Sequence, residues 1–243
     1  MKQSLIFLTL FTMIILEVNG QTQIQSGRVT YGFTEIESEF TENRDEIFDK
    51  LHKQGEDVTF ILSFSDSKSV FEIATTLEND ISPLGKSWAE NIVSKGRYYT
   101  NLEQNVVYRQ TDAYGEKILI KSPIDSRNWK LTNESKFIGK HKTFKATKNK
   151  TVENSVGTFN FEIVAWYCPQ LPGQFGPKEF NSLPGLILEL RDTHFTFYAT
   201  EIEIMKSESL DIKPLKGKIL TEKEYSNKIK AITPGFFSPQ NRL

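Results

Sequence analysis

The sequence contains little of what marks several common protein classes. Only one of its 243 residues is cysteine, so no disulfide can form within the chain, and burial of side chains must hold the fold together. The 30 basic and 31 acidic residues nearly cancel. A balanced chain has no long-range attraction for polyanions, which argues against nucleic-acid binding. After Gly20, no stretch is apolar enough to span a bilayer.

Common catalytic and cofactor-binding signatures are also absent from the sequence. It contains no G-x-S-x-G elbow, no phosphate-binding glycine loop, no H-E-x-x-H and no C-x-x-C pattern. Its three histidines, His52, His141 and His194, lie far apart. We therefore assign no catalytic residue, no metal ligand and no cofactor from the sequence.

The first 20 residues have the composition of a secretory signal peptide. Lys2 supplies a positive start, Leu5 to Leu16 form an apolar stretch, and Val18 and Gly20 are small enough to precede a cleavage site. We expect cleavage after Gly20 and export to the periplasm or the extracellular side of the cell envelope. An uncleaved anchor helix is the alternative, although this apolar stretch is short for a bilayer.

Alternating apolar residues predict many short strands and few helices. Helices are expected from Asn43 to Gly55 and after Thr221, where Glu224 completes a capping box, and residues 79–91 are expected to form a loop with some helical turns. A change of parity predicts a bulge near Thr200. Strands are expected at residues 28–33, 58–64, 70–74, 96–102, 105–111, 116–121, 128–132, 141–147, 158–167, 186–191 and 194–205.

This pattern predicts a mainly β fold of the α+β class. We expect one large, curved antiparallel sheet, shaped like a half-open barrel and covered in part by one or two helices. A single β-rich domain would occupy residues 21–232, and residues 233–243, with two prolines and a glycine, would form a mobile tail.

A Pro/Gly-rich loop stands out between two of the predicted strands. Proline fixes φ and glycine permits positive φ, so such a loop follows a specific path and can clamp the flanking strands together. Cys168 precedes the loop among large apolar residues, which favours a buried thiol over an exposed one. Leu183 to Leu186 is expected to form a type II turn. The residues assigned to this structural motif are Pro169, Pro172, Gly176, Pro177, Leu183, Pro184, Gly185 and Leu186.

Polar side chains beside the loop form the candidate binding surface. If the flanking strands pair, Glu162, Trp166, Glu189 and Arg191 gather on one face, and Tyr167 lies next to them in sequence. A polar face with an embedded tryptophan suits a ligand. The alternative is a plain exposed face with a Glu–Arg pair worth under about 1 kcal/mol.

Asp192 and His194 form a second, weaker candidate. They are two residues apart on a predicted strand and could begin a metal site or an acid–base pair. A solvated turn between two strands is the simpler interpretation, and the sequence marks no third ligand.

Several motifs together resemble the GLPGLI family of exported bacterial proteins. Ser182 to Ile187, SLPGLI, resembles the signature hexapeptide, and the upstream run from Ala165 to Phe180 resembles the preceding family pattern. Trp129-Lys130-Leu131, Ile138-Gly139 and Lys145-Ala146-Thr147 resemble an earlier family block. Departures are Ser182 for glycine, Thr143 where many members have cysteine, and Lys178 where many have tryptophan. The resemblance implies a Gram-negative envelope location, often beside TonB-dependent receptors, and no established reaction.

Three functions follow from these observations as hypotheses. The first is an exported binding or accessory protein that holds a lipid, a hydrophobic peptide or a segment of an outer-membrane receptor. The second is an envelope hydrolase using Asp192, His194 and Glu162. The third is a structural subunit of a TonB-dependent receptor complex, with the Pro/Gly-rich loop as its docking element.

Overall fold

A computed structural model describes residues 25–37, 46–75, 82–113, 115–124, 128–153, 157–205 and 208–232. The predicted signal peptide, the start of the first predicted helix and the predicted C-terminal tail lie outside these ranges. Within them, twelve strands form one sheet that does not close, in the order β12-β6-β5-β4-β3-β2-β1-β11-β10-β9-β8-β7. None of the helices in the described ranges is both long enough and apolar enough to cross a membrane.

The elements alternate little between helix and strand. The helices are α2 (Glu46–Gly55), α3 (Pro83–Trp88), the π-helix η1 (Ala89–Ser94) and α4 (Glu222–Ile232). The strands are β1 (Ser26–Glu35), β2 (Phe60–Ser65), β3 (Lys68–Ile73), β4 (Arg97–Asn101), β5 (Val106–Ala113), β6 (Glu116–Pro123), β7 (Lys130–Ile138), β8 (His141–Glu153), β9 (Thr158–Cys168), β10 (Leu186–Arg191), β11 (Phe195–Met205) and β12 (Lys218–Thr221).

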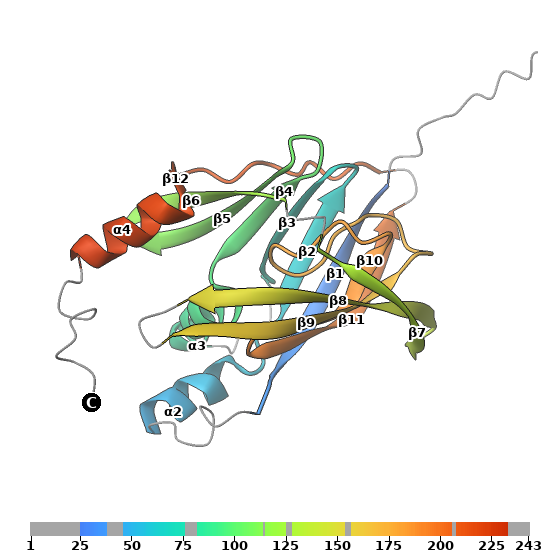
Figure 1. Ribbon diagram of the computed structural model, residues 1–243, viewed down its shortest axis with the longest axis horizontal. Helices are drawn as coiled ribbons and strands as arrows, with labels where there is room; N and C mark the ends of the chain where they lie inside the picture. The colour runs from blue at the N-terminus through green and yellow to red at the C-terminus, as the bar shows by residue number, and fades with distance from the viewer. Residues whose placement is uncertain are drawn as a thin grey trace, which may run out of the picture.

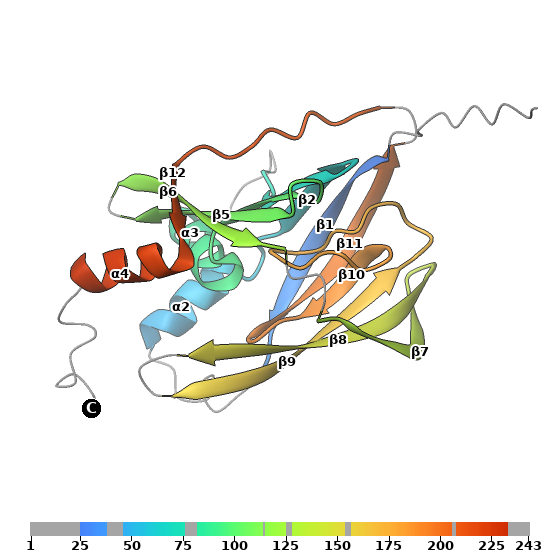
Figure 2. The same ribbon diagram turned by 45° about the horizontal axis from the view of Figure 1, so that its top comes forward.

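The predicted large antiparallel sheet is confirmed, with one parallel pair of strands at an edge that makes the sheet mixed. β12 pairs with β6 in parallel, whereas the other strand pairs are antiparallel. A parallel neighbour needs a long crossover. Here an extended segment after β11, residues 208–217, runs along the top of Figure 2 to the far edge of the sheet. Strands β7 to β9 pass in front of the central strands, which gives the predicted curved, open shape (Figure 1).

The predicted bulge near Thr200 is confirmed, and the helical turns predicted within residues 79–91 are more extensive than expected in the described part of this segment. Thr30 pairs with Glu201 and Tyr31 with Ala199, so Thr200 is left over in the register. Residues Pro83–Ser94 form α3 and η1. The Ser82 side chain caps α3 by accepting a hydrogen bond from Gly85 N at 3.0 Å.

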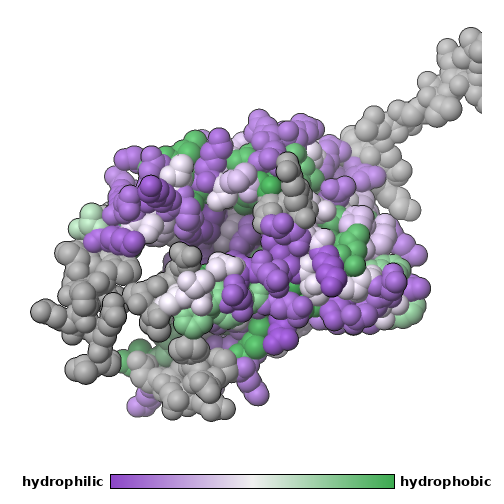
Figure 3. Space-filling model, viewed as in Figure 1, coloured by the Kyte–Doolittle hydropathy of each residue, from purple (hydrophilic) through white to green (hydrophobic). Residues whose placement is uncertain are grey.

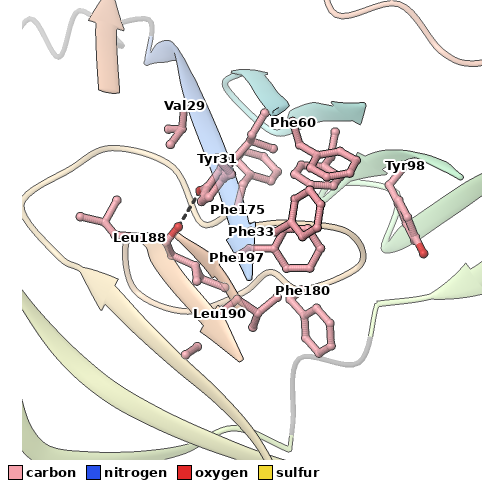
Figure 4. Packing of buried hydrophobic residues seen from close by; sticks show 14 of the residues in the cluster. Val29, Tyr31, Phe33, Phe60, Tyr98, Phe175, Phe180, Leu188, Leu190 and Phe197 are labelled. Atoms are coloured by element: carbon pink, nitrogen blue, oxygen red, sulfur yellow. Dashed lines mark hydrogen bonds between the residues drawn. The ribbon is translucent and has the colours of Figure 1, made fainter. Parts of the chain in front are cut away.

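Aromatic side chains fill the inner face of the curved sheet. Phe60 stacks on Phe71 with ring centroids 5.4 Å apart, and Phe197 packs edge-on against both rings. The Pro/Gly-rich loop adds Phe175 and Phe180 to the same cluster (Figure 4). Because the interior is close-packed with the chain's own side chains, the core, and not a bound ligand, holds the sheet in its curved form.

Tyr31 gives one test of this core. Its hydroxyl is fully buried and donates a 2.6 Å hydrogen bond to the Ile187 carbonyl, and burial raises its pKa far above the usual value. Tyr31→Phe should lower the free energy of unfolding by about 1–2 kcal/mol, because that buried carbonyl loses its partner. Urea unfolding at pH 7 would measure this, with the exposed Tyr198→Phe as control. Equal stability of the two variants would contradict the expectation.

Candidate functional site

The Pro/Gly-rich loop between β9 and β10 folds back across the inner face of the sheet. Ser182 N donates to Gln174 O at 2.8 Å, and Ile187 N donates to Phe175 O at 3.0 Å. Its end is a tighter turn than the predicted type II turn, because Gly185 N donates to Leu183 O at 2.8 Å. Between these closures the loop places Lys178, with a φ of 59°, in the interior of the molecule and the half-buried Glu179 next to it.

A buried ion pair joins this loop to the end of β10. Lys178 and Asp192 are each about 97% buried (side-chain exposures 3% and 3%), and Lys178 Nζ lies 2.5 Å from Asp192 Oδ2. Burial alone would raise the pKa of the Asp192 carboxyl. The charges of Lys178 and Lys150 outweigh burial and lower this pKa from 3.8 to about 2. Asp192 is therefore a carboxylate at any physiological pH.

Lys150 on β8 extends this pair to a network. Its ammonium group lies 2.9 Å from Glu179 Oε1 and 3.7 Å from Asp192 Oδ1. Burial opposes the charge of Lys150, but the two carboxylates outweigh it and raise the pKa of Lys150. Two oxygens of the network, Glu179 Oε2 and Asp192 Oδ1, are buried and accept no hydrogen bond from the described residues. Each carboxylate of the network thus accepts a lysine hydrogen bond through one oxygen only.

A cleft of about 690 Å³ opens above this network, between the β4–β6 side of the sheet and β8. The space-filling view shows a hollow there with mostly hydrophilic surroundings (Figure 3). We call it the cationic cleft, because five cations and two carboxylates line it. Its lining residues are Lys95, Tyr98, Val107, Arg109, Ile120, Ser122, Pro123, Trp129, Lys148, Asn149, Lys150, Thr151, Val152, Lys178, Glu179, Phe180, Asn181 and Glu222.

The electrostatics of the cleft favour an anion. Loss of hydration, followed by repulsion from Lys178 and Lys150, lowers the pKa of Lys95 at its rim. Burial is the larger cause of this fall in pKa, and the two neighbouring ammonium groups add to it. Three of the five cations have carboxylate partners: Lys178 and Lys150 pair within the network, and Arg109 Nη2 lies 3.3 Å from Glu222 at the start of α4. Five cations against the three carboxylates Glu179, Glu222 and Asp192 leave a net excess of two positive charges at the cleft.

Two aromatic rings lie beside the cations. Trp129 and Phe180 have ring centroids 6.2 Å apart, and Trp129 Nε1 donates to Asn181 O at 3.0 Å, which fixes the indole. Lys148 lies 5.8 Å from the Trp129 ring and Lys150 lies 5.3 Å from the Phe180 ring. The cleft can thus hold a ligand with both an anionic group and a flat or apolar part.

The predicted binding surface lies on the other face of the sheet. Trp166 pairs with Glu189, as predicted, and Lys136 joins them, with Nζ 2.7 Å from Glu189 and 4.5 Å from the Trp166 ring centroid. Arg191 is exposed opposite Val164. Glu162 is exposed opposite Asn149, and Tyr167 is buried against Phe144 in the core, where burial raises its pKa. The predicted Glu–Arg pair is replaced by a Glu–Lys pair.

Asp192 and His194 lie in different surroundings. Both lie in the turn between β10 and β11, but Asp192 is buried against Lys178, so a solvated turn is the wrong description for it. The His194 ring packs against Phe161 at 5.8 Å, and burial followed by the charge of Lys95 lowers its pKa. In the described ranges, no three histidine, cysteine or acidic side chains gather to hold a metal ion.

A second cavity of about 790 Å³ lies at the opposite end of the loop. Several residues of the predicted structural motif line it, including Pro169, Pro172, Pro184 and Gly185, and Asp66 is its one charged lining residue. Cys168, which precedes the loop, is fully buried, as its neighbours predicted. This cavity lacks convergent charge, so we take the cationic cleft as the candidate site.

Comparisons with known proteins bear on fold and family more than on function. Residues 153–189 match the model of a bacterial family described as protein of unknown function (Porph_ging). An uncharacterised bacterial family therefore fits the segment that contains the loop, while the GLPGLI name is not confirmed. No curated protein matches the chain.

Solved structures with a similar fold include PNGF-II. Its structures in the C2 and P21 space groups align with TM-scores of 0.53 and 0.52, at 14% and 15% sequence identity. These matches cover 84% of this chain but only 32% and 33% of the PNGF-II chains. The chain thus spans about a third of the length of its structural neighbour, and at this identity the likeness concerns the fold alone.

Proposed function

We propose that this chain is an exported binding protein whose ligand carries an anionic group and binds in the cationic cleft. The observation that carries the proposal is the gathering of Lys95, Arg109, Lys148, Lys150 and Lys178 around one cavity. The whole chain has a net charge of −1, so this excess of cations is local. Export is supported by the composition of the first 20 residues.

The filled interior of the sheet bears on the other hypotheses. A lipid or hydrophobic peptide would need the inner face, where Phe60, Phe71 and Phe197 already pack together. A filled interior favours a structural subunit of a receptor complex as the second candidate function. The hydrolase hypothesis gains no support, because Asp192 is buried in an ion pair with Lys178.

Titration with small anions tests the proposal. Isothermal calorimetry with pyrophosphate and with citrate, at 50 mM salt, should detect binding by the protein. Lys95→Gln and Lys148→Gln should each weaken it about tenfold, which corresponds to about 1.4 kcal/mol for one lost charge contact. Neither substitution should unfold the protein, because both lysines lie outside the buried network.

Lys213→Gln is the matched control, since Lys213 is 80% exposed and lies outside the cleft. It should leave the affinity unchanged. Binding should also weaken when the salt concentration rises to 500 mM. Absence of heat with both anions, or equal affinity for the cleft variants and the control, would refute the proposal.

A further inference from the structure

The β7–β8 hairpin concentrates positive charge in a nearly neutral chain. Residues 130–150 contain seven lysines and a single carboxylate, Glu134. Charge balance over the whole chain conceals this local excess. β7 is also an edge of the sheet, so one side of the hairpin faces no further strand. The hairpin therefore carries a basic surface, although Ala146 belongs to the core and Ile138 and Phe144 pack against it.

The lysines of the hairpin fall into two groups. Lys136 and Lys145 are neutralised by Glu189 and Glu134, at 2.7 and 3.0 Å. At the tip, Lys140 and Lys142 are exposed, and no carboxylate of the described residues lies within ion-pair distance of either. The uncompensated charge of the hairpin is thus located at its tip.

An exposed aromatic side chain stands among these cations. Phe137 pairs with Lys142 across the hairpin, so both side chains project from the same face. Phe137 is 70% exposed, and Leu131 further along β7 is 53% exposed. Exposure of a phenyl ring to water is unfavourable in free energy. A phenyl ring flanked by lysines is typical of surfaces that bind at the boundary between lipid headgroups and acyl chains.

We propose that the tip of the β7–β8 hairpin docks on an anionic lipid bilayer. Phe137 enters the headgroup boundary, while Lys140 and Lys142 lie against lipid phosphates. Charge complementarity selects an anionic surface, and the exposed ring selects a bilayer over a soluble polyanion, which has no apolar layer to receive it.

This docking leaves the cationic cleft open. Lys148 is the first residue of β8 that lines the cleft and Lys142 belongs to the tip, so the two sites are about 20 Å apart along one strand. In Figure 1 the hairpin turn lies at the right of the molecule, and the strand end that faces the cleft lies at the left. A protein docked in this way would present the cleft away from the membrane.

Vesicle co-sedimentation tests the docking. The protein should begin at Gln21, which keeps every described residue and removes the apolar stretch near the N-terminus that could itself enter a bilayer. At 50 mM salt, it should bind vesicles of 30% phosphatidylglycerol in phosphatidylcholine and not pure phosphatidylcholine. Lys140→Gln combined with Lys142→Gln should weaken binding about 30-fold, since each lysine near an anionic surface strengthens binding about fivefold.

Matched controls lie on α2. Ile47→Ser removes a side chain that is 71% exposed, for comparison with Phe137→Ser, which should weaken vesicle binding at least fivefold. Lys50→Gln combined with Lys53→Gln removes two exposed charges without touching the tip. Both control variants should bind vesicles like the unmodified protein.

A fluorescent variant supplies an independent readout. The emission of Phe137→Trp should shift to shorter wavelength with phosphatidylglycerol vesicles and remain unshifted with phosphatidylcholine vesicles. Three results would each overturn the inference: equal binding to both vesicle types, equal binding of tip and control variants, or lysine dependence with no effect of Phe137→Ser. The last result would identify a polyanion site and not a bilayer site.

Discussion

Gly185→Ala is expected to destabilise the protein by more than about 3 kcal/mol. A Cβ at this position would lie 2.1 Å from the Cys168 carbonyl oxygen and 2.8 Å from Pro169 Cα. Both atoms belong to the backbone, so neither can move aside as a side chain would. The φ of Gly185, 143°, adds strain for any residue with a Cβ. Overpacking and strain each cost about 1–3 kcal/mol.

Gly139→Ala separates these two costs. Gly139 also has a positive φ, 56°, but a Cβ there would meet no atom within 4 Å. This variant should lose only the free energy that corresponds to backbone strain at positive φ, about 1 kcal/mol. Thermal unfolding should therefore show a fall in Tm of at least about 6 °C for Gly185→Ala and about 2–4 °C for Gly139→Ala. Similar Tm values for the two variants would show that the contact with Cys168 does not matter.

Asp192→Asn should cost about 3–5 kcal/mol, because it leaves the buried Lys178 ammonium without its counterion. The same change should alter the dependence of stability on pH. The pKa of Asp192 is about 2 in the folded protein, against an ordinary value of 3.8. Its contribution is therefore fully present above about pH 4 and is lost as the pH falls from about 4 to about 2. Urea unfolding at pH 7, 4 and 2.5 would measure both effects.

An exposed pair of the same chemistry is the control. Asp211 lies 3.3 Å from Lys213, with both side chains about four-fifths exposed. Asp211→Asn should change the free energy of unfolding by less than about 0.5 kcal/mol. A second variant, Lys178→Met with Asp192→Leu, removes both charges and should be more stable than Asp192→Asn alone. If Asp192→Asn behaves like Asp211→Asn, the buried pair does not stabilise the fold.

Local patterns in the sequence were sufficient for most strands. Val29, Tyr31 and Phe33 alternate because one face of β1 is buried, and the parity change at Thr200 located a real bulge. The extent of the helix α3 was missed because its apolar pattern is short. Its only signals are the capping residue Ser82 and Pro83 at its start. The helix itself is too short for its apolar residues to show a recognisable helical period.

The cationic cleft could not be derived from sequence patterns. Its charged residues come from the end of η1, from β5, from β8, from the loop and from the start of α4, and only the curvature of the sheet brings them together. Lys148 and Lys150 read as ordinary solvated lysines on a strand. The one local signal was Lys178, at a position where many members of the family that the sequence resembles have tryptophan. This difference does not reveal that Asp192 is the buried partner of Lys178.

The order of strands also determines when folding can finish. β1, the first strand, lies in the middle of the sheet between β2 and β11, and Thr30 pairs with Glu201. A ribosome that adds about 5–20 residues per second therefore needs about 10–30 s after β1 emerges to supply its second neighbour. During this time the junction of β1 with β11 cannot form, so the nascent chain stays open long enough to meet chaperones.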